Sequence, residues 1–338
     1  MKYLIKLSLL VFILSACGPL IPISSEPTAL PGIREYQDFA YDIVWSQDDS
    51  MIALTTLTGL YVYNADTYEQ LFAFSESGGW GAVFGKNYVA AVGNDGLSVW
   101  DLNGFKPLFH IAPDDPVQFQ SIAISPDDTV LVTGEKDQLR VWSLPDGELI
   151  AKIPIEGWAS DVKFRSAERL IVANTYLGNV EEWNVPDAKK IREFNFQKPV
   201  INLRFSQDAK LVLVDYGIPG FELWNIGKGE IQHGYGDIVS ASGWQRLSGD
   251  NRYAVVWGYA FDGQNSGMSI WDLDVHTQLR EFVTPFFNGD GWRCGSLNSN
   301  GSILAASNNE GSIIFFDAKS GSRKGEIYLP YKYVVEKG

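Results

Sequence analysis

The chain has 338 residues and a formal net charge of −14 at pH 7, and 13% of its residues are aromatic. An acidic surface of this kind disfavours the phosphate backbone of nucleic acids and anionic lipid surfaces, so we expect no nucleic-acid partner. No segment keeps a helical period, which favours one large all-β domain.

The first residues read as an export signal rather than as part of a fold. Lys2 and Lys6 give the N-terminal region a positive charge. Residues 7–16 form an apolar run that is too short to span a ~30 Å bilayer as a helix. The run ends in Leu14-Ser15-Ala16-Cys17, which resembles the lipobox of bacterial lipoproteins. That resemblance implies cleavage of residues 1–16 and a lipid on Cys17. The alternative is an ordinary secretory peptide cut near Ala16, which leaves a free thiol.

Residues 17–32 are predicted to form an extended tether, because this stretch holds four prolines and shows neither a strand nor a helix period. Fully extended, it would reach on the order of 45 Å at ~3.1 Å per residue. The domain that follows would therefore stand clear of the lipid headgroups. We expect the protein to cross the cytoplasmic membrane and to stay lipid-anchored on its outer face or in an outer membrane.

Residues 33–330 carry a unit that is repeated seven times. The clearest copy, residues 124–149, reads as short strands separated by turns, and its turn Ser125-Pro126-Asp127 recurs as Ser46-Gln47-Asp48 and Ser206-Gln207-Asp208. One such sheet cannot bury both faces alone, so the copies must stack on one another. The third strand of each copy ends in a similar motif, and successive motifs are 37 to 47 residues apart. The seven motifs are LYVYN (60–64), LSVWD (97–101), LRVWS (139–143), VEEWN (180–184), FELWN (221–225), MSIWD (268–272) and IIFFD (313–317).

A four-stranded unit of about 40 residues with a Trp-Asp ending resembles the WD-repeat family. The resemblance implies a monomeric seven-bladed β-propeller of four-stranded antiparallel blades. The chain departs from the family because it has no Gly-His dipeptide, so the buried indole N–H groups must find other partners. The full motif stands at Trp100-Asp101 and Trp271-Asp272, and weaker forms are Trp142-Ser143, Trp183-Asn184, Trp224-Asn225, Phe316-Asp317 and Tyr63-Asn64.

Two segments compete for the outer strand of the last blade. In many WD-repeat proteins the N-terminal segment supplies that strand, and residues 33–39 have the register for it. Residues 324–330 could complete the same blade from the C-terminal side. We favour the N-terminal strand, because pairing the distant chain ends removes an exposed edge. Residues 331–338 would then be a tail or an extra edge strand.

The sequence offers no arrangement of residues for catalysis, a metal or a cofactor. Its three histidines, His110, His233 and His276, are isolated, and it has no C-x-x-C, G-x-S-x-G or G-x-G-x-x-G motif. Cys294 is left without a disulfide partner and is interpreted as a buried packing residue. We therefore expect no disulfide, no metal, no cofactor and no enzymatic activity.

Four tryptophans that each follow a glycine near the start of a blade are the candidate contact residues: Trp80, Trp158, Trp244 and Trp292. The loops that lead into the first strands lie on one rim of a propeller, so these rings could form a platform for a peptide or a sugar. The alternative is that they pack between neighbouring blades.

Two functions remain open. The first is a non-catalytic scaffold at the cell envelope, held on the membrane through Cys17 and bound to another envelope or extracytoplasmic protein. The second is a carbohydrate- or small-ligand-binding propeller, or an enzyme, that uses the central funnel or the Trp-bearing rim. The charged first-strand residues that could approach the funnel are Asp42, Asp161, Arg204 and Arg293, a thin set for catalysis that favours the scaffold.

Overall fold

The computed structural model describes residues 33–74, 79–113, 119–196, 198–217, 220–235, 245–259, 265–285, 291–329 and 331–335. The predicted signal peptide (1–16), the lipidated Cys17, the tether (17–32) and Trp244 lie outside the described residues. Within those ranges, no helix is long and apolar enough to cross a membrane.

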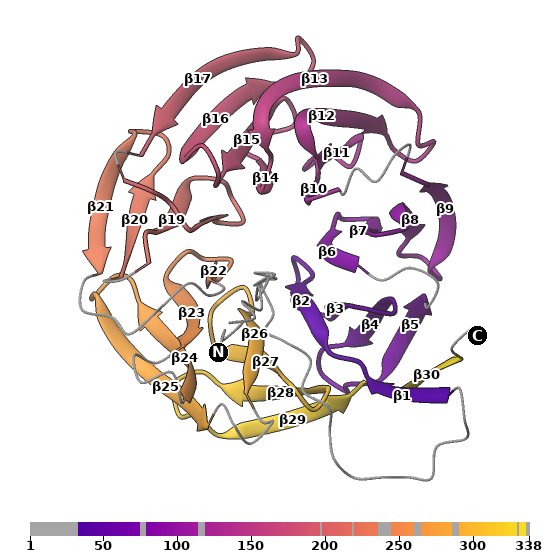
Figure 1. Cartoon of the computed structure of the whole chain (residues 1–338), viewed down its shortest axis with the longest axis vertical. Helices are drawn as coiled ribbons and strands as arrows, with labels where there is room; N and C mark the ends of the chain where they lie inside the picture. The colour runs from indigo at the N-terminus through magenta and orange to yellow at the C-terminus, as the bar shows by residue number, and fades with distance from the viewer. Residues whose placement is uncertain are drawn as a thin grey trace, which may run out of the picture.

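Seven four-stranded antiparallel sheets are arranged as blades around a central axis, as the sequence predicts (Figure 1). Each blade uses four consecutive strands, with the first nearest the axis, and we number the blades 1 to 7 in chain order. The innermost strands are β2 (Ala40–Trp45), β6 (Gly79–Phe84), β10 (Ser121–Ile124), β14 (Asp161–Phe164), β18 (Asn202–Phe205), β22 (Gln245–Leu247) and β26 (Trp292–Leu297).

The other three strands of each blade follow outward in the same order. The second strands are β3 (Met51–Thr56), β7 (Tyr88–Gly93), β11 (Val130–Gly134), β15 (Arg169–Asn174), β19 (Leu211–Asp215), β23 (Tyr253–Tyr259) and β27 (Ile303–Asn308). The third strands are β4 (Leu60–Asn64), β8 (Gly96–Asp101), β12 (Lys136–Ser143), β16 (Asn179–Asn184), β20 (Phe221–Asn225), β24 (Asn265–Asp272) and β28 (Ser312–Asp317). The outer strands are β5 (Gln70–Phe74), β9 (Lys106–Ile111), β13 (Leu149–Trp158), β17 (Lys189–Asn195), β21 (Glu230–Tyr235), β25 (Thr277–Pro285) and β29 (Arg323–Tyr328).

The hydrophobic core lies between the blades rather than at the axis. In blade 1, β3 is buried along almost its whole length, whereas β5 is largely exposed. Clusters of buried side chains cross from one blade to the next, as where Val83 and Leu97 of blade 2 pack with Ile122 and Leu131 of blade 3. Each blade therefore depends on its neighbours for its core, as expected of stacked repeats.

The three predicted Ser-x-Asp turns form, a fourth forms at Ser248, and each links the first strand of a blade to the second. The serine hydroxyl donates to the aspartate two residues later at 2.6 to 2.8 Å, in the pairs Ser46–Asp48, Ser125–Asp127, Ser206–Asp208 and Ser248–Asp250. The same aspartate also accepts a hydrogen bond from a backbone N–H further along the turn. The side chains therefore satisfy backbone groups that have no strand partner within the turn.

In two of these turns the next residue is a second aspartate that joins adjacent blades. Asp128 has a left-handed backbone with φ of 57°, and its carboxylate accepts the N–H groups of Lys86 and Asn87 in blade 2 at 3.1 and 2.7 Å. Asp49, with φ of 60°, likewise accepts the N–H of Ser299 in blade 7 at 2.9 Å. Asp tolerates this conformation because its short side chain can hydrogen-bond locally.

Four of the five tryptophans at the ends of third strands donate an indole hydrogen bond within their own blades. Trp142 Nε1 donates to the hydroxyl of Thr133 on the neighbouring strand at 3.1 Å. The sequence, which lacks the Gly-His dipeptide, did not show which groups accept these indole N–H bonds, and the structure identifies them. In three blades the acceptor stands two residues before the tryptophan, on the same face of the strand: Glu181 for Trp183 (2.8 Å), Glu222 for Trp224 (2.9 Å) and Ser269 for Trp271 (3.0 Å).

The preference for an N-terminal outer strand in the last blade is wrong. Blade 7 takes all four strands from the C-terminal part of the chain, and its outer strand is β29. The segment β1 (Ile33–Gln37) pairs instead with β30 (Tyr331–Val335), at the periphery of the ring (Figure 1). A short hairpin from β28 to β29 costs less chain entropy than recruiting a strand from the far end of the chain. Of the two alternatives for residues 331–338, a tail or an extra strand, Tyr331–Val335 form an extra strand.

Side chains close the ring between blades 7 and 1. Cys294 Sγ donates to the carbonyl of Ala40 at 3.3 Å, and Trp45 Nε1 donates to the carbonyl of Ser296 at 3.2 Å. Phe315 of β28 lies in the same buried cluster. Cys294 is buried here, as the sequence predicts.

Candidate functional site

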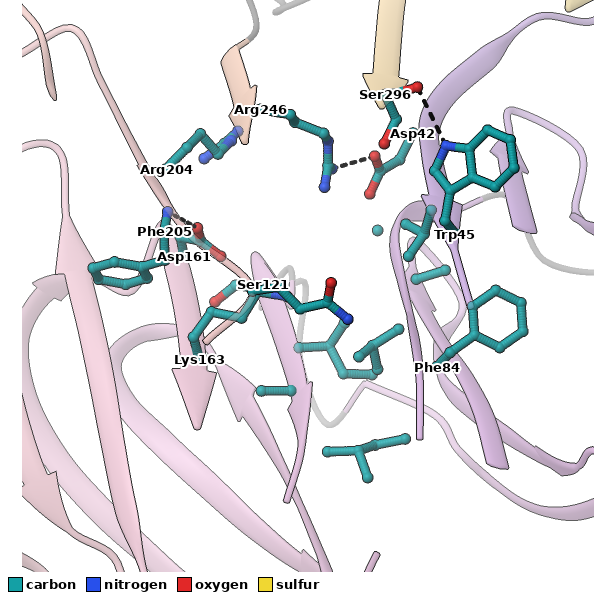
Figure 2. Close-up of a pocket in the computed structure, with 18 of the residues that line it drawn as sticks. Asp42, Trp45, Phe84, Ser121, Asp161, Lys163, Arg204, Phe205, Arg246 and Ser296 are labelled. Carbon is teal, nitrogen blue, oxygen red and sulfur yellow. Dashed lines mark hydrogen bonds and ion pairs between the residues drawn. The ribbon is translucent and has the colours of Figure 1, made fainter. Parts of the chain in front are cut away.

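The innermost strands of all seven blades line a cavity of about 230 Å³ at the axis of the ring (Figure 2). The polar side chains that line it include Asp42, Asp161, Lys163, Arg204 and Arg246. Figure 2 shows Lys163 and Arg204 on the side of this space opposite Trp45 and Phe84, and Arg246 beside Asp42. The cavity thus brings together charged groups from blades 1, 4, 5 and 6.

One position of the innermost strand forms a single layer around the cavity, which we call the channel layer. Each of its residues stands two positions before the residue that begins the turn into the second strand. Because the seven innermost strands are equivalent, residues at this position lie at the same height along the axis. The channel layer consists of Val44, Val83, Ala123, Lys163, Arg204, Arg246 and Ser296, and all seven residues line the cavity. Its three basic residues come from the consecutive blades 4, 5 and 6.

Two carboxylates lie beside these cations, and both are engaged. Asp42 of blade 1 is buried and forms an ion pair with Arg246 of blade 6. Asp161 Oδ2 accepts the backbone N–H of Phe205 at 3.0 Å, which ties blade 4 to blade 5. Arg204 Nη1 donates to the carbonyl of Leu203 at 3.0 Å.

The environment of the cavity lowers the pKa of two of its basic residues. Burial lowers the pKa of Lys163; Asp161 and Asp42 oppose this shift, while Arg246 and Arg204 reinforce it. Burial likewise lowers the pKa of Arg204, and Arg246 adds to that effect. The charged forms of Lys163 and Arg204 are therefore disfavoured in this low-dielectric space.

Of the four charged residues predicted to approach the axis, three do so. Asp42, Asp161 and Arg204 line the cavity, whereas Arg293 does not. The prediction missed Lys163 and Arg246, although both occupy the same strand position as Arg204. Both residues could have been found by aligning the seven first-strand sequences at the turn that follows each of them. In that alignment the three basic residues share one position.

A second feature lies at the start of the first strands in blades 7, 1 and 2. In each of these strands the pairing register shifts by one residue, at Arg293, Tyr41 and Trp80. Such β-bulges re-aim a side chain and are over-represented next to functional sites. The three bulged residues and Phe39 form what we call the rim row.

The rim row is a continuous series of contacts across three blades. The guanidinium of Arg293 lies 3.4 Å from the centre of the Phe39 ring, a close cation–π contact. The rings of Phe39 and Tyr41 are 5.0 Å apart, and Tyr41 meets Trp80 edge-on at 5.6 Å. Within the row, Tyr41 and Trp80 are partly exposed, whereas Phe39 and Arg293 are buried.

Two members of the rim row carry donors without acceptors. Trp80 Nε1 and Arg293 Nε and Nη1 are buried and have no hydrogen-bond partner among the described residues. Arg293 as a whole is only 8% exposed. Buried donors are nearly always paired in folded proteins, so each unpaired donor calls for an explanation such as a bound partner.

The structure places the three described candidate tryptophans in different surroundings. Trp80 belongs to the rim row and also lines the cavity. Trp158 ends the outer strand β13, with Lys136 Nζ 6.0 Å from its ring centre. Trp292 is buried against Phe316 at 5.8 Å, in a cluster shared by blades 6 and 7. That these tryptophans contact a partner stays a prediction.

The described residues contain no group of three or more His, Cys, Asp or Glu that could hold a metal ion. His110 is exposed on β9, and His233 on β21 stacks on His276 with ring centres 3.6 Å apart.

Asp215 is a buried carboxyl whose ionisation the fold opposes. It lies on β19 and is 1% exposed, and burial raises its pKa to about 6. The N–H of Gly217, 2.7 Å from Oδ1, and the side chain of Gln245 only partly oppose this shift. Because the folded-state pKa lies above that of the unfolded chain, the stability that Asp215 contributes is full below about pH 4 and is lost as the pH rises through 6.

We therefore expect Asp215→Asn to raise the free energy of unfolding by about 2 kcal/mol at pH 7 and to change it little at pH 4. Urea denaturation at both pH values measures this difference. Asp187→Asn, at an exposed site, is the matched control. An equal effect of Asp215→Asn at pH 4 and pH 7 would contradict the shifted pKa.

The seven-bladed ring is consistent with the WD-repeat resemblance of the sequence. No family model matches the chain, and no curated protein matches it significantly. The assignment as a propeller therefore rests on the internal repeats and on the structure itself.

Proposed function

We propose that this protein is an interaction scaffold that binds a protein partner at the rim row. The observation that supports the proposal is the set of unpaired buried donors on Trp80 and Arg293, within an aromatic row that crosses three blades. Trp, Tyr and Arg are the residue types that dominate protein interfaces, because they combine a large contact area with directed hydrogen bonds.

The chemistry of the row defines what the partner must offer. Trp80 Nε1 and Arg293 can only donate hydrogen bonds, so the partner has to present carbonyl or carboxylate oxygens. Tyr41 and Trp80 present ring faces and edges that suit an apolar or aromatic side chain. An extended peptide segment with an acidic and an apolar residue fits both requirements.

The placement of this scaffold in the cell follows from residues 1–32. We propose that Cys17 carries the lipid, that the tether holds the ring clear of the membrane, and that the partner is another envelope or extracytoplasmic protein. The role is binding rather than catalysis. Two or three acyl chains, at ~0.8 kcal/mol per buried CH₂, would make the anchoring nearly permanent.

The test is chemical crosslinking on intact cells that carry the full chain, followed by purification in mild detergent and quantitative mass spectrometry. We expect one or two envelope proteins at near-equal amounts in the membrane fraction, and Cys17→Ser should release the complex from that fraction. Trp80→Ala should lower partner recovery by about 10-fold or more, as for an interface residue that contributes most of the binding energy. Trp80→Phe should have an intermediate effect, because it keeps the packing and removes only the N–H.

Tyr328→Ala is the control, since it removes an exposed aromatic ring from the outer strand β29. Circular dichroism of each variant separates loss of binding from loss of fold. Equal partner recovery with Trp80→Ala and with the parent chain would exclude the rim row as the contact face. Absence of any partner would count against the scaffold.

A further inference from the structure

Two of the three histidines, which are isolated in the sequence, meet at the outer edges of neighbouring blades. His233 lies on the outer strand β21 of blade 5, and His276 lies in the turn between β24 and β25 of blade 6. Their rings stack face to face, with centres 3.6 Å apart and an angle of 6° between the planes. The fold therefore joins two imidazoles that are one repeat apart in the chain.

Tyr235 connects this stack to the core between blades 5 and 6. Its hydroxyl lies 3.0 Å from Nδ1 of His276, and its ring meets that of His233 with centres 4.6 Å apart. Tyr235 is 4% exposed and stacks on Phe221 at 4.5 Å. Both of these rings belong to a buried cluster that crosses from blade 5 into blade 6. The two histidines therefore lie at the outer end of the contact between these blades.

The charged groups on the blade 6 side of the stack are engaged with other residues. Asp272 and Asp274, in the turn that carries the second histidine, both contact Arg252, at 3.0 and 3.5 Å. Arg280 of β25 donates to the carbonyl of Lys319 in blade 7 at 2.9 Å. The carboxylates of the turn thus already share a cation.

On the blade 5 side, the acidic groups of β20 and β21 also have partners of their own. Glu230 of β21 pairs with Lys228 at 3.3 Å, and Glu222 of β20 pairs with Lys198 at 3.0 Å. Burial raises the pKa of Tyr235 to about 12, so its hydroxyl carries no charge near neutral pH. A proton on one imidazole therefore acts mainly on the other imidazole.

Two imidazolium ions stacked at this distance repel each other. Burial lowers the pKa of His233, and the charge of His276 adds to that effect. We propose that the His233–His276 stack is a pH-sensitive clasp between the outer edges of blades 5 and 6, which holds while at most one ring is charged and opens when both are protonated. A free histidine titrates at about pH 6.5, so the stability that the clasp contributes is full above that value and is lost as the pH falls. The clasp is independent of the rim row, which lies in blades 7, 1 and 2.

Nuclear magnetic resonance of the imidazole C–H groups tests the stack, because the full chain holds only three histidines. We expect His276→Asn to raise the pKa of His233, since it removes the neighbouring charge and introduces a residue type that tolerates the left-handed backbone of this turn, with φ of 56°. His110→Asn makes the same change on β9 of blade 2 and is the matched control. An unchanged titration of His233 in His276→Asn would overturn the proposal.

Hydrogen–deuterium exchange measures whether the clasp opens. After correction for the intrinsic effect of pH on exchange, the backbone amides of β21 should exchange faster at pH 5 than at pH 7 by about 5-fold or more. That factor corresponds to two unit charges about 4 Å apart in water. The outer strand β17 of blade 4 is the internal reference and should show no such acceleration.

His233→Phe separates the charge from the contact. A phenylalanine ring can stack on His276 but takes up no proton, so this variant should keep β21 protected at pH 5. His276→Asn loses the stack at every pH and should exchange equally fast at pH 5 and pH 7. Absence of acceleration in the parent chain, or equal acceleration in the parent chain and in His233→Phe, would refute the clasp.

Discussion

Arg140→Met is expected to lower the free energy of unfolding by about 3–5 kcal/mol at pH 7, the cost of leaving one member of a buried ion pair alone. Arg140 Nε lies 3.0 Å from Glu135 Oε1, and Glu135 is 0% exposed. Glu135 also accepts a hydrogen bond from Gln138 at 2.7 Å, and its neighbour Thr133 binds the indole of Trp142. The substitution removes the only positive charge in direct contact with that carboxylate among the described residues.

The loss should depend on pH, and its sign follows from the ionisation of Glu135. Burial already raises the pKa of Glu135, with Gln138 and Arg140 opposing the shift. Without Arg140 the pKa rises further, so the variant is most stable below the pKa of the unfolded chain, near 4, and loses stability as the pH rises. Urea denaturation between pH 4 and pH 7 measures this slope.

Two further variants decide whether the buried charge is the cause. The double variant Glu135→Leu with Arg140→Met should recover much of the loss, because it removes both buried charges together. Arg323→Met breaks an exposed pair with Glu326 on the outer strand β29 and should cost less than about 1 kcal/mol. A loss for Arg140→Met that is the same at pH 4 and pH 7 would assign the effect to packing instead.

Phe315→Ala is expected to destabilise the ring by a similar amount, about 3–5 kcal/mol. Phe315 lies on β28 of blade 7 and is 0% exposed. Its ring meets Tyr68 at 4.5 Å and Trp45 at 6.1 Å, and both of these belong to blade 1. The truncation therefore leaves a cavity at the junction where the first and last blades close the ring.

Urea denaturation followed by tryptophan fluorescence measures this loss. Tyr328→Ala removes an aromatic ring of similar size from the same blade at a position that is 71% exposed, and it should change stability by less than about 0.5 kcal/mol. Equal effects of the two substitutions would show that the contact between blades 7 and 1 does not limit the stability of the ring.

The sequence by itself determined the parts of this protein that are local. The Ser-x-Asp turns, the strand run between them and the Trp-Asp endings lie within one repeat of about 40 residues, so pattern and turn chemistry predict them. The number of blades and their four strands follow from counting those repeats. The acceptors of Trp183, Trp224 and Trp271 could also have been predicted, because each stands two residues before its tryptophan on the same strand face.

The tertiary structure alone decided what depends on neighbouring blades. Lys163, Arg204 and Arg246 are about 40 residues apart in the chain, and only the ring brings them to one cavity. The bulges at Tyr41, Trp80 and Arg293 shift the register by one residue, which a period-two pattern does not show. The choice of β29 over β1 for the last blade was likewise settled by the lower entropy cost of a short hairpin. Repeat patterns describe the blade, whereas the site arises where equivalent positions of different blades meet around one axis.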